Sequence, residues 1–345
     1  MLNRRQFIVS SLIAGRMLSA QAGAGAQSRG QHRLPANDAH LKRVRDYVED
    51  IPVPEYHWAS DRAYEAFRDI KYGVRLHWGI YSTLKLRGES WPFLAMSFEE
   101  RQRYQQIYKT WNPRGFDAGA WMDLFAECGM RMFAFTSKHH DGFSLFDTKT
   151  RVVRRANWTA EGGPRLEDCN LAYSSIYPLG SSFSYEDDPA RHKGAAWIVR
   201  NIVDCAAKGG NFMVGIGPDG DGQFHPTAKE QLREAGAWLK VNGQGIYATR
   251  EREGELWREG EGGRFTRSKD GSLVHAFMLS WPGEYLKLAS VRPRSGAAIH
   301  FLGHPDPLSW RLENGSLIID LPESLQDPAR RPCQFAWGLS IPIQK

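Results

Sequence analysis

A pattern of helix, glycine, strand and polar tip occurs twice in this chain and limits the folds that it can adopt. In residues 116–140, Asp117 can cap a helix whose apolar residues recur at helical spacing, and Gly129 ends that helix before an apolar strand. Residues 192–222 repeat the same order, with the helix stopping at Gly209. This alternation predicts an α/β fold, a (β/α) TIM-like barrel, in which functional residues gather at the carboxyl ends of the strands.

Histidines stand at the ends of the predicted strands. The apolar run "MFAF" leads to the pair His139 and His140, and the strand predicted at 71–77 ends in His77 beside Trp78. Neighbouring residues of a strand point to opposite faces, so an adjacent pair serves one site only where the strand ends and the chain turns. A hydrogen-bonded structural role is the alternative. A zinc site is not supported, because no Cys-x-x-Cys or His-Glu-x-x-His spacing accompanies the histidines.

Residues 1–26 are predicted to form a twin-arginine export signal. Arg4 and Arg5 precede a modest apolar stretch, and small residues that suit cleavage follow it. Arg16 interrupts the apolar stretch, which is far shorter than the roughly 20 residues needed to span a bilayer. We therefore expect a periplasmic or secreted protein that is not held in a membrane.

The composition is that of a folded protein with two domains. The chain has 345 residues, of which 41% are hydrophobic, and its net charge of +6 falls by three when the signal and its arginines are removed. Lysines and arginines do not form runs with interleaved aromatic residues, so nucleic-acid binding is not expected. The four cysteines permit disulfides in an oxidising compartment but do not demand them.

The pattern changes near residue 250 to short alternating runs separated by turn signals. The pair Asn314–Gly315 between two of these runs is a strong hairpin signal. We therefore expect a small antiparallel β-sandwich over residues 251–345. The barrel-like domain is predicted to occupy residues 38–250.

Six segments together resemble one enzyme family. In chain order they read "YGVRLHWGIYS", "ESW", "WNPRGFDAGAW", "TSKHHDGFSLFDTKT", "KGGNFMVGIGPDGDG" and "WLKVNGQGIYAT". They resemble segments of the family 29 glycoside hydrolases, the α-L-fucosidases, over residues 60–250 with one break. The resemblance implies hydrolysis of terminal α-L-fucosyl residues with retention of configuration. The implied partner is a fucosylated oligosaccharide or glycoconjugate, and no metal or organic cofactor is implied.

The resemblance also implies which residues hold the sugar. The positions that match the family's fucose pocket are His77, Glu89, Trp91, His139 and His140. Their chemistry agrees with this role. Neutral imidazoles can donate to and accept from sugar hydroxyls, and an indole offers an apolar face to sugar C–H groups.

The catalytic residues of such an enzyme are not found in the sequence. A retaining glycosidase needs two carboxyl groups roughly 5–5.5 Å apart, one as the nucleophile and one as the acid and base. The family's nucleophilic aspartate follows a strand in the middle of the barrel, but the stretch from Thr150 to Arg191 holds little strand material. A closed barrel has eight strands, whereas we predict strands near 71–77, 130–136, 176–186 and 211–216.

The barrel is therefore predicted to be incomplete, with a seam between Ser174 and Ser175 and with the nucleophile and the acid/base residue absent. We assign none of the remaining acids to these roles. Asp219 in "GPDGDG" is expected to form a turn, and three acids can cap a following helix. The remaining acids in question are Asp141, Asp147, Glu167, Asp168, Glu186, Asp187 and Asp188.

Three hypotheses follow for the function. The first is an exported α-L-fucosidase with impaired catalysis, and the second is a non-catalytic protein that binds fucose or another carbohydrate. The third is a defective gene product without a stable fold, because an incomplete barrel leaves sheet edges and apolar faces unpaired. A second copy of the chain could complete the barrel, but nothing in the sequence specifies such an interface or an oligomeric state.

The export signal can be tested by fusing residues 1–30 to a folded reporter. We expect the fusion to reach the periplasm by a route that needs Arg4 and Arg5, because the twin-arginine pathway reads this pair. Cell fractionation of the fusion and of its Arg4→Lys, Arg5→Lys double variant measures this. Unchanged export of the double variant would contradict the prediction.

Overall fold

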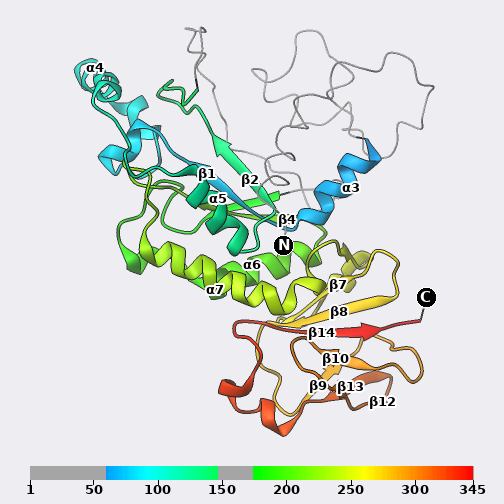
Figure 1. Cartoon of the computed structure of the whole chain (residues 1–345). Helices are drawn as coiled ribbons and strands as arrows, with labels where there is room; N and C mark the ends of the chain where they lie inside the picture. Colours follow the sequence, from blue (N-terminus) through cyan, green and yellow to red (C-terminus); the bar gives the residue numbers. More distant parts are fainter. Residues whose placement is uncertain (1–59, 147–173, 345) are drawn as a thin grey trace, which may run out of the picture. The chain divides into compact units, whose positions relative to one another are not determined.

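A computed structural model describes residues 60–146 and 174–344 of the chain (Figure 1). The predicted export signal at 1–26 lies outside the described residues, as do Asp147, Glu167 and Asp168.

Four parallel strands form the first sheet, in the order β2-β1-β4-β3. Strand β1 pairs in parallel with β2 on one side and with β4 on the other, and β3 pairs in parallel with β4 (Figure 1). The strands are β1 (Tyr72–His77), β2 (Met132–Thr136), β3 (Ser174–Pro178) and β4 (Asn211–Ile216). The strands that lead to His77, His139 and Gly217 are therefore adjacent and parallel, as predicted from the repeated pattern. Strands β2 and β3 lie at opposite edges of this sheet.

The helices between the strands begin and end where local sequence signals predict. The Asp117 carboxylate caps helix α5 (Ala118–Glu127), which precedes β2, by accepting from the N–H groups of Gly119 at 2.7 Å and Ala120 at 3.0 Å. Gly129 and Gly209 end two helices in the left-handed region, with φ values of 79° and 82°. The helices are α3 (Asp61–Ile70), α4 (Phe98–Gln106), α5 (Ala118–Glu127), α6 (Ala195–Ala207) and α7 (Pro226–Asn242).

The main core joins one face of the parallel sheet to helices α5, α6 and α7. Alternate residues of β1 and β4, such as Val74 and Val214, are fully buried there beside Phe125 of α5 and Ile202 of α6. Strand β4 is buried along its whole length, which explains its continuous apolar sequence "NFMVGI".

Strand β3 differs from its prediction, because it spans Ser174–Pro178 rather than 176–186. The chain leaves the sheet after Pro178, and the Phe183 ring then folds back over Gly215 of β4, where an added Cβ would lie 2.2 Å from a ring carbon. The predicted seam between Ser174 and Ser175 falls at the start of this strand.

The C-terminal part consists of two antiparallel sheets, as predicted for a sandwich. Their strand orders are β11-β10-β14-β8-β7-β5, with β6 beside β7, and β12-β13-β9. Apolar residues of both sheets share one core, among them Phe265 and Val274 from the first and Leu288 and Ile319 from the second. The strands are β5 (Arg250–Glu251), β6 (Arg258–Glu259), β7 (Gly263–Arg267), β8 (Leu273–Met278), β9 (Tyr285–Leu288), β10 (Ile299–Phe301), β11 (Pro307–Leu308), β12 (Trp310–Glu313), β13 (Ser316–Asp320) and β14 (Trp337–Pro342).

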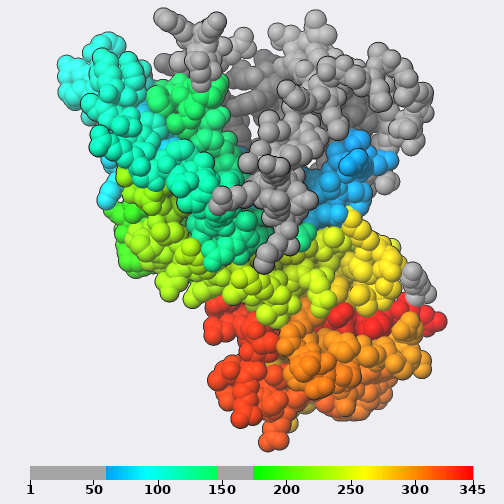
Figure 2. Space-filling view, in the orientation of Figure 1, coloured from blue at the N-terminus to red at the C-terminus, as the bar shows by residue number. Residues whose placement is uncertain are grey.

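The hairpin predicted at Asn314–Gly315 is confirmed. Strands β12 and β13 pair directly across it, and both turn residues have positive φ, 48° at Asn314 and 73° at Gly315. Helix α7 contacts this part of the chain through Trp238, whose indole N–H donates to the Ala336 carbonyl at 2.7 Å. The space-filling view shows α7 in yellow-green against the orange and red C-terminal segments (Figure 2).

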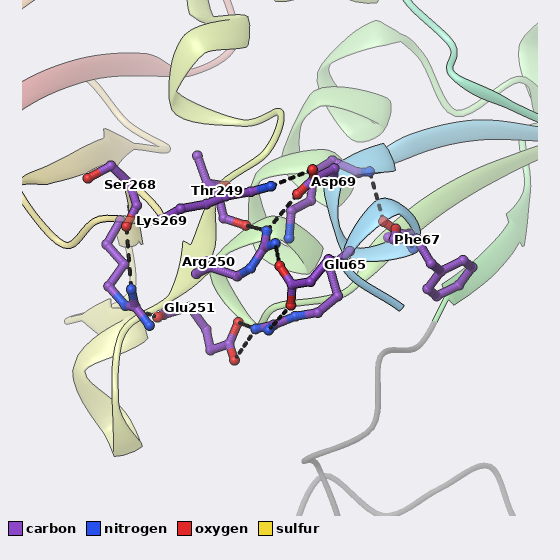
Figure 3. A network of polar contacts seen from close by, with 12 residues as sticks. Glu65, Phe67, Asp69, Thr249, Arg250, Glu251, Ser268 and Lys269 are labelled. Atoms are coloured by element: carbon purple, nitrogen blue, oxygen red, sulfur yellow. Dashed lines mark hydrogen bonds and ion pairs between the residues drawn. The ribbon is translucent and has the colours of Figure 1, made fainter. Parts of the chain in front are cut away.

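An ion-pair network ties α3 to β5 (Figure 3). The Arg250 guanidinium, whose side chain is 5% exposed, donates to Asp69 at 2.9 Å, to the Thr249 carbonyl at 2.7 Å and to Glu65. Burial by itself would raise the pKa of Glu65 and of Asp69. Hydrogen bonds from Arg250 and from Lys269 outweigh burial and hold both pKa values below their usual range.

None of the helices in the described part of the chain is long and apolar enough to cross a membrane.

The network in Figure 3 predicts a pH-dependent stability. We expect Arg250→Met to lower the free energy of unfolding by about 2 kcal/mol at neutral pH, because Glu65 and Asp69 lose their buried partner. Both acids have lowered pKa values in the folded state. Their contribution is therefore present above the unfolded pKa of about 4 and is lost as the pH falls through the folded pKa values. Urea unfolding between about pH 7 and about pH 3 measures the difference.

The matched control is Arg233→Met. Arg233 pairs with Glu127 at 3.1 Å, but both side chains are about half exposed. We expect a loss below about 1 kcal/mol for this variant. A loss for Arg250→Met that is no larger than the control, or that stays constant down to low pH, would contradict the prediction.

Candidate active site

The predicted site residues come together at the carboxyl ends of β1 and β2. His77 is the last residue of β1, and His139 follows β2 by three positions. Their imidazole ring centroids lie 5.5 Å apart at a steep angle. The ring of His140 lies 4.5 Å from that of His139. Both adjacent histidines therefore belong to one site, because β2 ends before them.

One buried side chain, Ser90, fixes the orientation of His139. Ser90, which is fully buried, has its Oγ 2.6 Å from Nδ1 of His139. The same oxygen accepts from the Asp141 backbone N–H at 3.1 Å, and its own proton can be donated to Nδ1 of His139. In that tautomer, Nε2 of His139 carries a proton and can donate to a ligand.

Trp91 forms the open side of the site. Its indole is 44% exposed, and its ring centroid lies 3.8 Å from that of His140 and 6.2 Å from that of His139. An exposed indole beside two imidazoles can cover the apolar face of a small polar ligand.

Glu89 reaches the site in a strained conformation. Its φ of 55° lies in the left-handed region, which a residue with a Cβ seldom adopts, and the residue is 4% exposed. Its N–H donates to Oγ of Ser184 at 2.6 Å, and this hydroxyl lies 3.4 Å from the Glu89 carboxylate. Burial raises the pKa of Glu89, and the hydrogen bonds from Ser184 and Phe183 offset only part of the rise. Glu89 is thus held against the segment that follows β3.

The imidazoles of the site are neutral at physiological pH. Burial lowers the pKa of His77 to about 3, and the charges of Arg75 and His139 act in the same direction. Burial, His140 and Arg75 lower the pKa of His139 to about 4. Neutral rings can both donate and accept, which suits hydroxyl groups.

Sequence reasoning missed several side chains that shape the site. The Phe183 ring lies 5.1 Å from the His77 ring, and the Tyr81 ring lies 5.8 Å from the His139 ring. Ser90 and Ser184 orient His139 and Glu89. Tyr81 follows the segment "HWG" and Ser90 lies within "ESW", both of which carry the family resemblance and so give a signal, whereas the return of Phe183 over Gly215 has no local signal.

Most of the acids considered in the sequence that lie within the described residues accept hydrogen bonds from neighbouring groups. Asp141 accepts from the Tyr104 hydroxyl at 2.6 Å and from the Phe143 N–H at 3.1 Å, and burial raises its pKa. Glu186 accepts from the N–H of Ser181 at 3.2 Å and from its hydroxyl. Asp219 accepts from two backbone N–H groups at 2.9 Å, which confirms it as a turn former.

Metal-ligand types do not gather at this site. In the two described ranges, no group of three or more histidines, cysteines or acids could hold a metal ion. Cys128 and Cys205 are buried within the helical layer and are free thiols.

The site lies where polar and aromatic side chains follow the carboxyl ends of parallel strands that alternate with helices. Enzymes with a (β/α) barrel have their active sites in this position. The sequence profile described as alpha-L-fucosidase matches residues 51–167 and 161–244, and the profile of the alpha-L-fucosidase C-terminal domain matches residues 260–342. The chain belongs to the alpha-L-fucosidase family of glycoside hydrolases. The two segments of the first match meet at 161–167, earlier in the chain than the seam predicted at Ser174–Ser175.

Individual relatives agree with this membership. The chain is 32% identical to the tissue alpha-L-fucosidase of Mus musculus over 418 residues, which cover 80% of this chain and 91% of the relative. It is 21% identical to the plasma alpha-L-fucosidase of Homo sapiens over 426 residues, covering 80% and 89%. Both alignments are longer than the 345 residues of this chain. The relatives therefore contain segments that have no counterpart here.

A solved structure shows the same fold. The alpha-fucosidase of Thermotoga maritima in complex with fucose superposes with a TM-score of 0.63 at 19% identity, covering 80% of this chain and 96% of that chain.

The buried histidine at the end of β1 makes a prediction for acid conditions. Because the pKa of His77 is about 3 in the folded chain and about 6.5 when unfolded, the unfolded state binds an extra proton between these values. Stability is therefore lost as the pH falls from about 6.5 toward 3, with a slope of up to about 1.4 kcal/mol per pH unit. We expect His77→Asn to show a shallower loss over this window, measured by urea unfolding at several pH values.

The matched control is His300→Asn, since His300 lies exposed on β10. This variant should keep the pH dependence of the original chain. An unchanged slope in His77→Asn would show that His77 is protonated as readily when folded as when unfolded.

Proposed function

We propose that this protein binds terminal L-fucose in the manner of an α-L-fucosidase but hydrolyses fucosides poorly. The observation that carries the proposal is the gathering of His77, His139 and His140 around an exposed Trp91 at adjacent strand ends. Glu89 completes the proposed sugar site. The Thermotoga maritima relative, which was solved with fucose, supports fucose as the ligand.

The order of the strands supports an incomplete barrel. In a (β/α) barrel, strands that are consecutive in the chain lie side by side, and the last strand closes on the first. Here β4 lies beside β1, as a last strand would, whereas β2 and β3 lie at opposite edges of the described sheet. Missing strands would fit between β2 and β3, and the long alignments with relatives agree with a loss inside the chain.

The loss of these strands removes catalysis more than binding. The family's nucleophile belongs to a strand in the middle of the barrel, and we propose that it is absent together with the acid/base residue. Asp141 and Glu186 are held by Tyr104 and Ser181, and neither is proposed to replace it. Contacts made equally in the ground state and the transition state bind the sugar without accelerating its hydrolysis.

The organisation and location of the protein complete the proposal. Residues 1–26 would direct export by the twin-arginine route, residues 38–250 would form the barrel-like sugar-binding domain and residues 251–345 the β-sandwich. The site would then face fucosylated oligosaccharides or glycoconjugates in the periplasm or outside the cell. A human relative named for plasma supports a role outside the cytoplasm.

The experiment compares binding with turnover in the same purified chain. We expect saturable binding of L-fucose, measured by calorimetry, whereas an aryl α-L-fucoside should release aryl alcohol only in traces over hours. An aryl leaving group needs little acid assistance, so this substrate isolates the role of the nucleophile. D-fucose, the mirror image of L-fucose, controls for specific binding.

Variants separate the possible results. His139→Ala and Trp91→Ala should each weaken L-fucose binding at least fivefold, whereas His300→Ala on β10 should leave it unchanged. Turnover above about ten per second that disappears on replacing Asp141, Asp168 or Glu186 would show that a surviving carboxylate acts as the nucleophile. Absence of L-fucose binding would contradict the proposal as a whole.

A purely non-catalytic role as a fucose or carbohydrate receptor is the second candidate. It is favoured by the retention of the sugar-facing residues alongside acids that are bound to neighbouring groups. Both candidates predict the same L-fucose binding. Trace hydrolysis of the aryl fucoside over hours would indicate the impaired fucosidase, and no hydrolysis above the solvent reaction would indicate the non-catalytic receptor.

A further inference from the structure

Arg75 places a positive charge on the same face of β1 as His77. Tyr72, Val74 and Leu76 of this strand are buried in the core beside the helices. Because side chains alternate along a strand, Arg75 and His77 share the opposite face. Arg75 is thus one step deeper than the end of the strand, below the proposed sugar site.

Arg75 lacks the partner that comparable arginines have. Arg250 and Arg264, which are also largely buried, donate to carboxylates at 2.9 Å and 2.8 Å. In the described residues, nothing accepts from Arg75, and its Nε is fully buried without a hydrogen bond. Burial lowers the pKa of Arg75, and no carboxylate acts against this. A partly buried guanidinium that finds no counter-charge among the described residues is costly, which favours a partner from outside the chain.

The Arg75 guanidinium extends toward the sugar site. Its charge contributes to the lowered pKa values of His77 and His139, after burial in both cases. It also acts on Tyr81, where burial is the larger influence and raises the pKa. These three residues stand at or beyond the carboxyl ends of β1 and β2. The positive charge therefore lies near the place where the ligand would bind.

Other polar atoms near the ends of β1 and β2 also lack partners among the described residues. These atoms are buried at the end of β1, in the turn after it and at the end of β2. They are Nδ1 of His77, the Tyr81 hydroxyl, Oγ of Ser82 and Oγ1 of Thr136. Thr136 is the register partner of His77 across the two strands. Buried polar atoms without partners at these strand ends, where the charge of Arg75 acts on His77 and Tyr81, indicate a site for a polar ligand.

The nearby acids do not neutralise Arg75. Glu89 is held by Ser184, and Asp141 is held by Tyr104 and the Phe143 N–H. The pKa values of both acids are raised by burial, and Arg75 is not among the charges that act on either. Among the described residues, the site thus has a positive charge that Glu89 and Asp141 leave uncompensated.

We propose that this site takes a fucose-like sugar that carries a negatively charged group, a sulfate ester or a carboxylate, with Arg75 as its ionic partner. The inference rests on the proposed sugar-binding function and names the class of ligand more closely. A guanidinium presents donors in a planar fork that matches the oxygens of sulfate and carboxylate. A neutral sugar would leave the charge of Arg75 without an ionic partner.

The test measures the affinities of the whole purified chain for a set of related sugars by calorimetry. The set contains L-fucose, its 2-, 3- and 4-monosulfates and L-galacturonate, which has the ring configuration of L-fucose with a carboxylate at C6. We expect at least one anionic sugar to bind tenfold or more tightly than L-fucose. Whether the sulfates or the galacturonate bind best distinguishes the two kinds of anion. Raising the salt concentration should reduce the preference, because screening weakens ionic contacts.

Variants assign the preference to Arg75. Arg75→Met should reduce the preference for the anionic sugar at least fivefold while L-fucose binding changes less than twofold, and Arg75→Lys should keep part of the preference. The control is Arg131→Met, since Arg131 precedes β2 at its other end, stacks on the Tyr247 ring at 3.5 Å and is exposed there, away from the carboxyl ends of the strands. This variant should keep the full preference.

The outcomes separate the inference from the function on which it rests. If L-fucose binds and no anionic sugar binds more tightly, the inference is wrong and the sugar-binding function stands. A preference that survives in Arg75→Met overturns the role of Arg75. If neither L-fucose nor the anionic sugars bind, both the proposed function and the inference are wrong. Should Arg75→Met fail to fold, the affinities of the unaltered chain and of Arg75→Lys still decide.

Discussion

The parallel pairing of β1 between β2 and β4 is the constraint on which the site depends. It sets the carboxyl ends of the strands at one edge of the sheet, so that His77 and the segment with His139 arrive within 5.5 Å of each other. The helices α5 and α6 cover only one face of this sheet, and the alternation along β1 turns Val74 toward them and His77 away. A one-residue shift in the register of β1 would exchange these faces and place His77 in the apolar core.

The side chains at the strand ends are held by contacts between distant segments. Ser90 bridges the loop after β1 to His139 and Asp141, and Ser184 from beyond β3 bridges to Glu89. These hydroxyls are small and buried, so each fixes a neighbour without filling the site. The positive φ of Glu89 is maintained by such contacts, because an isolated residue would relax out of the left-handed region. The residues of β1, β2, β3 and β4 themselves have no such positive φ, so the strands that carry the site are not strained in this way.

Much of this arrangement could be predicted from the sequence where local rules decide. Asp117 capped its helix as expected, "NFMVGI" formed a buried strand, and the Asn314–Gly315 turn joined a hairpin. Prediction failed at β3, because the route of Phe183 depends on the space above Gly215 in another strand. The lack of a partner for Arg75 was equally hidden, since a sequence shows a charged residue but not whether an acid reaches it.

Binding and catalysis can be separated in such a fold, because different strands contribute the residues for each. Each parallel strand delivers its own side chains to the common edge, so a site assembled from several strands loses only what the missing ones carried. The described strands deliver imidazoles, an indole and a guanidinium, which recognise shape, hydroxyls and charge. A glycosidase needs in addition two carboxylates at a defined separation, and the acids beside these strands accept hydrogen bonds from Tyr104, Ser181 and Ser184 instead. A chain with the first set alone would keep the means to select a sugar, and in our proposal the positive charge at Arg75 decides which sugars are selected.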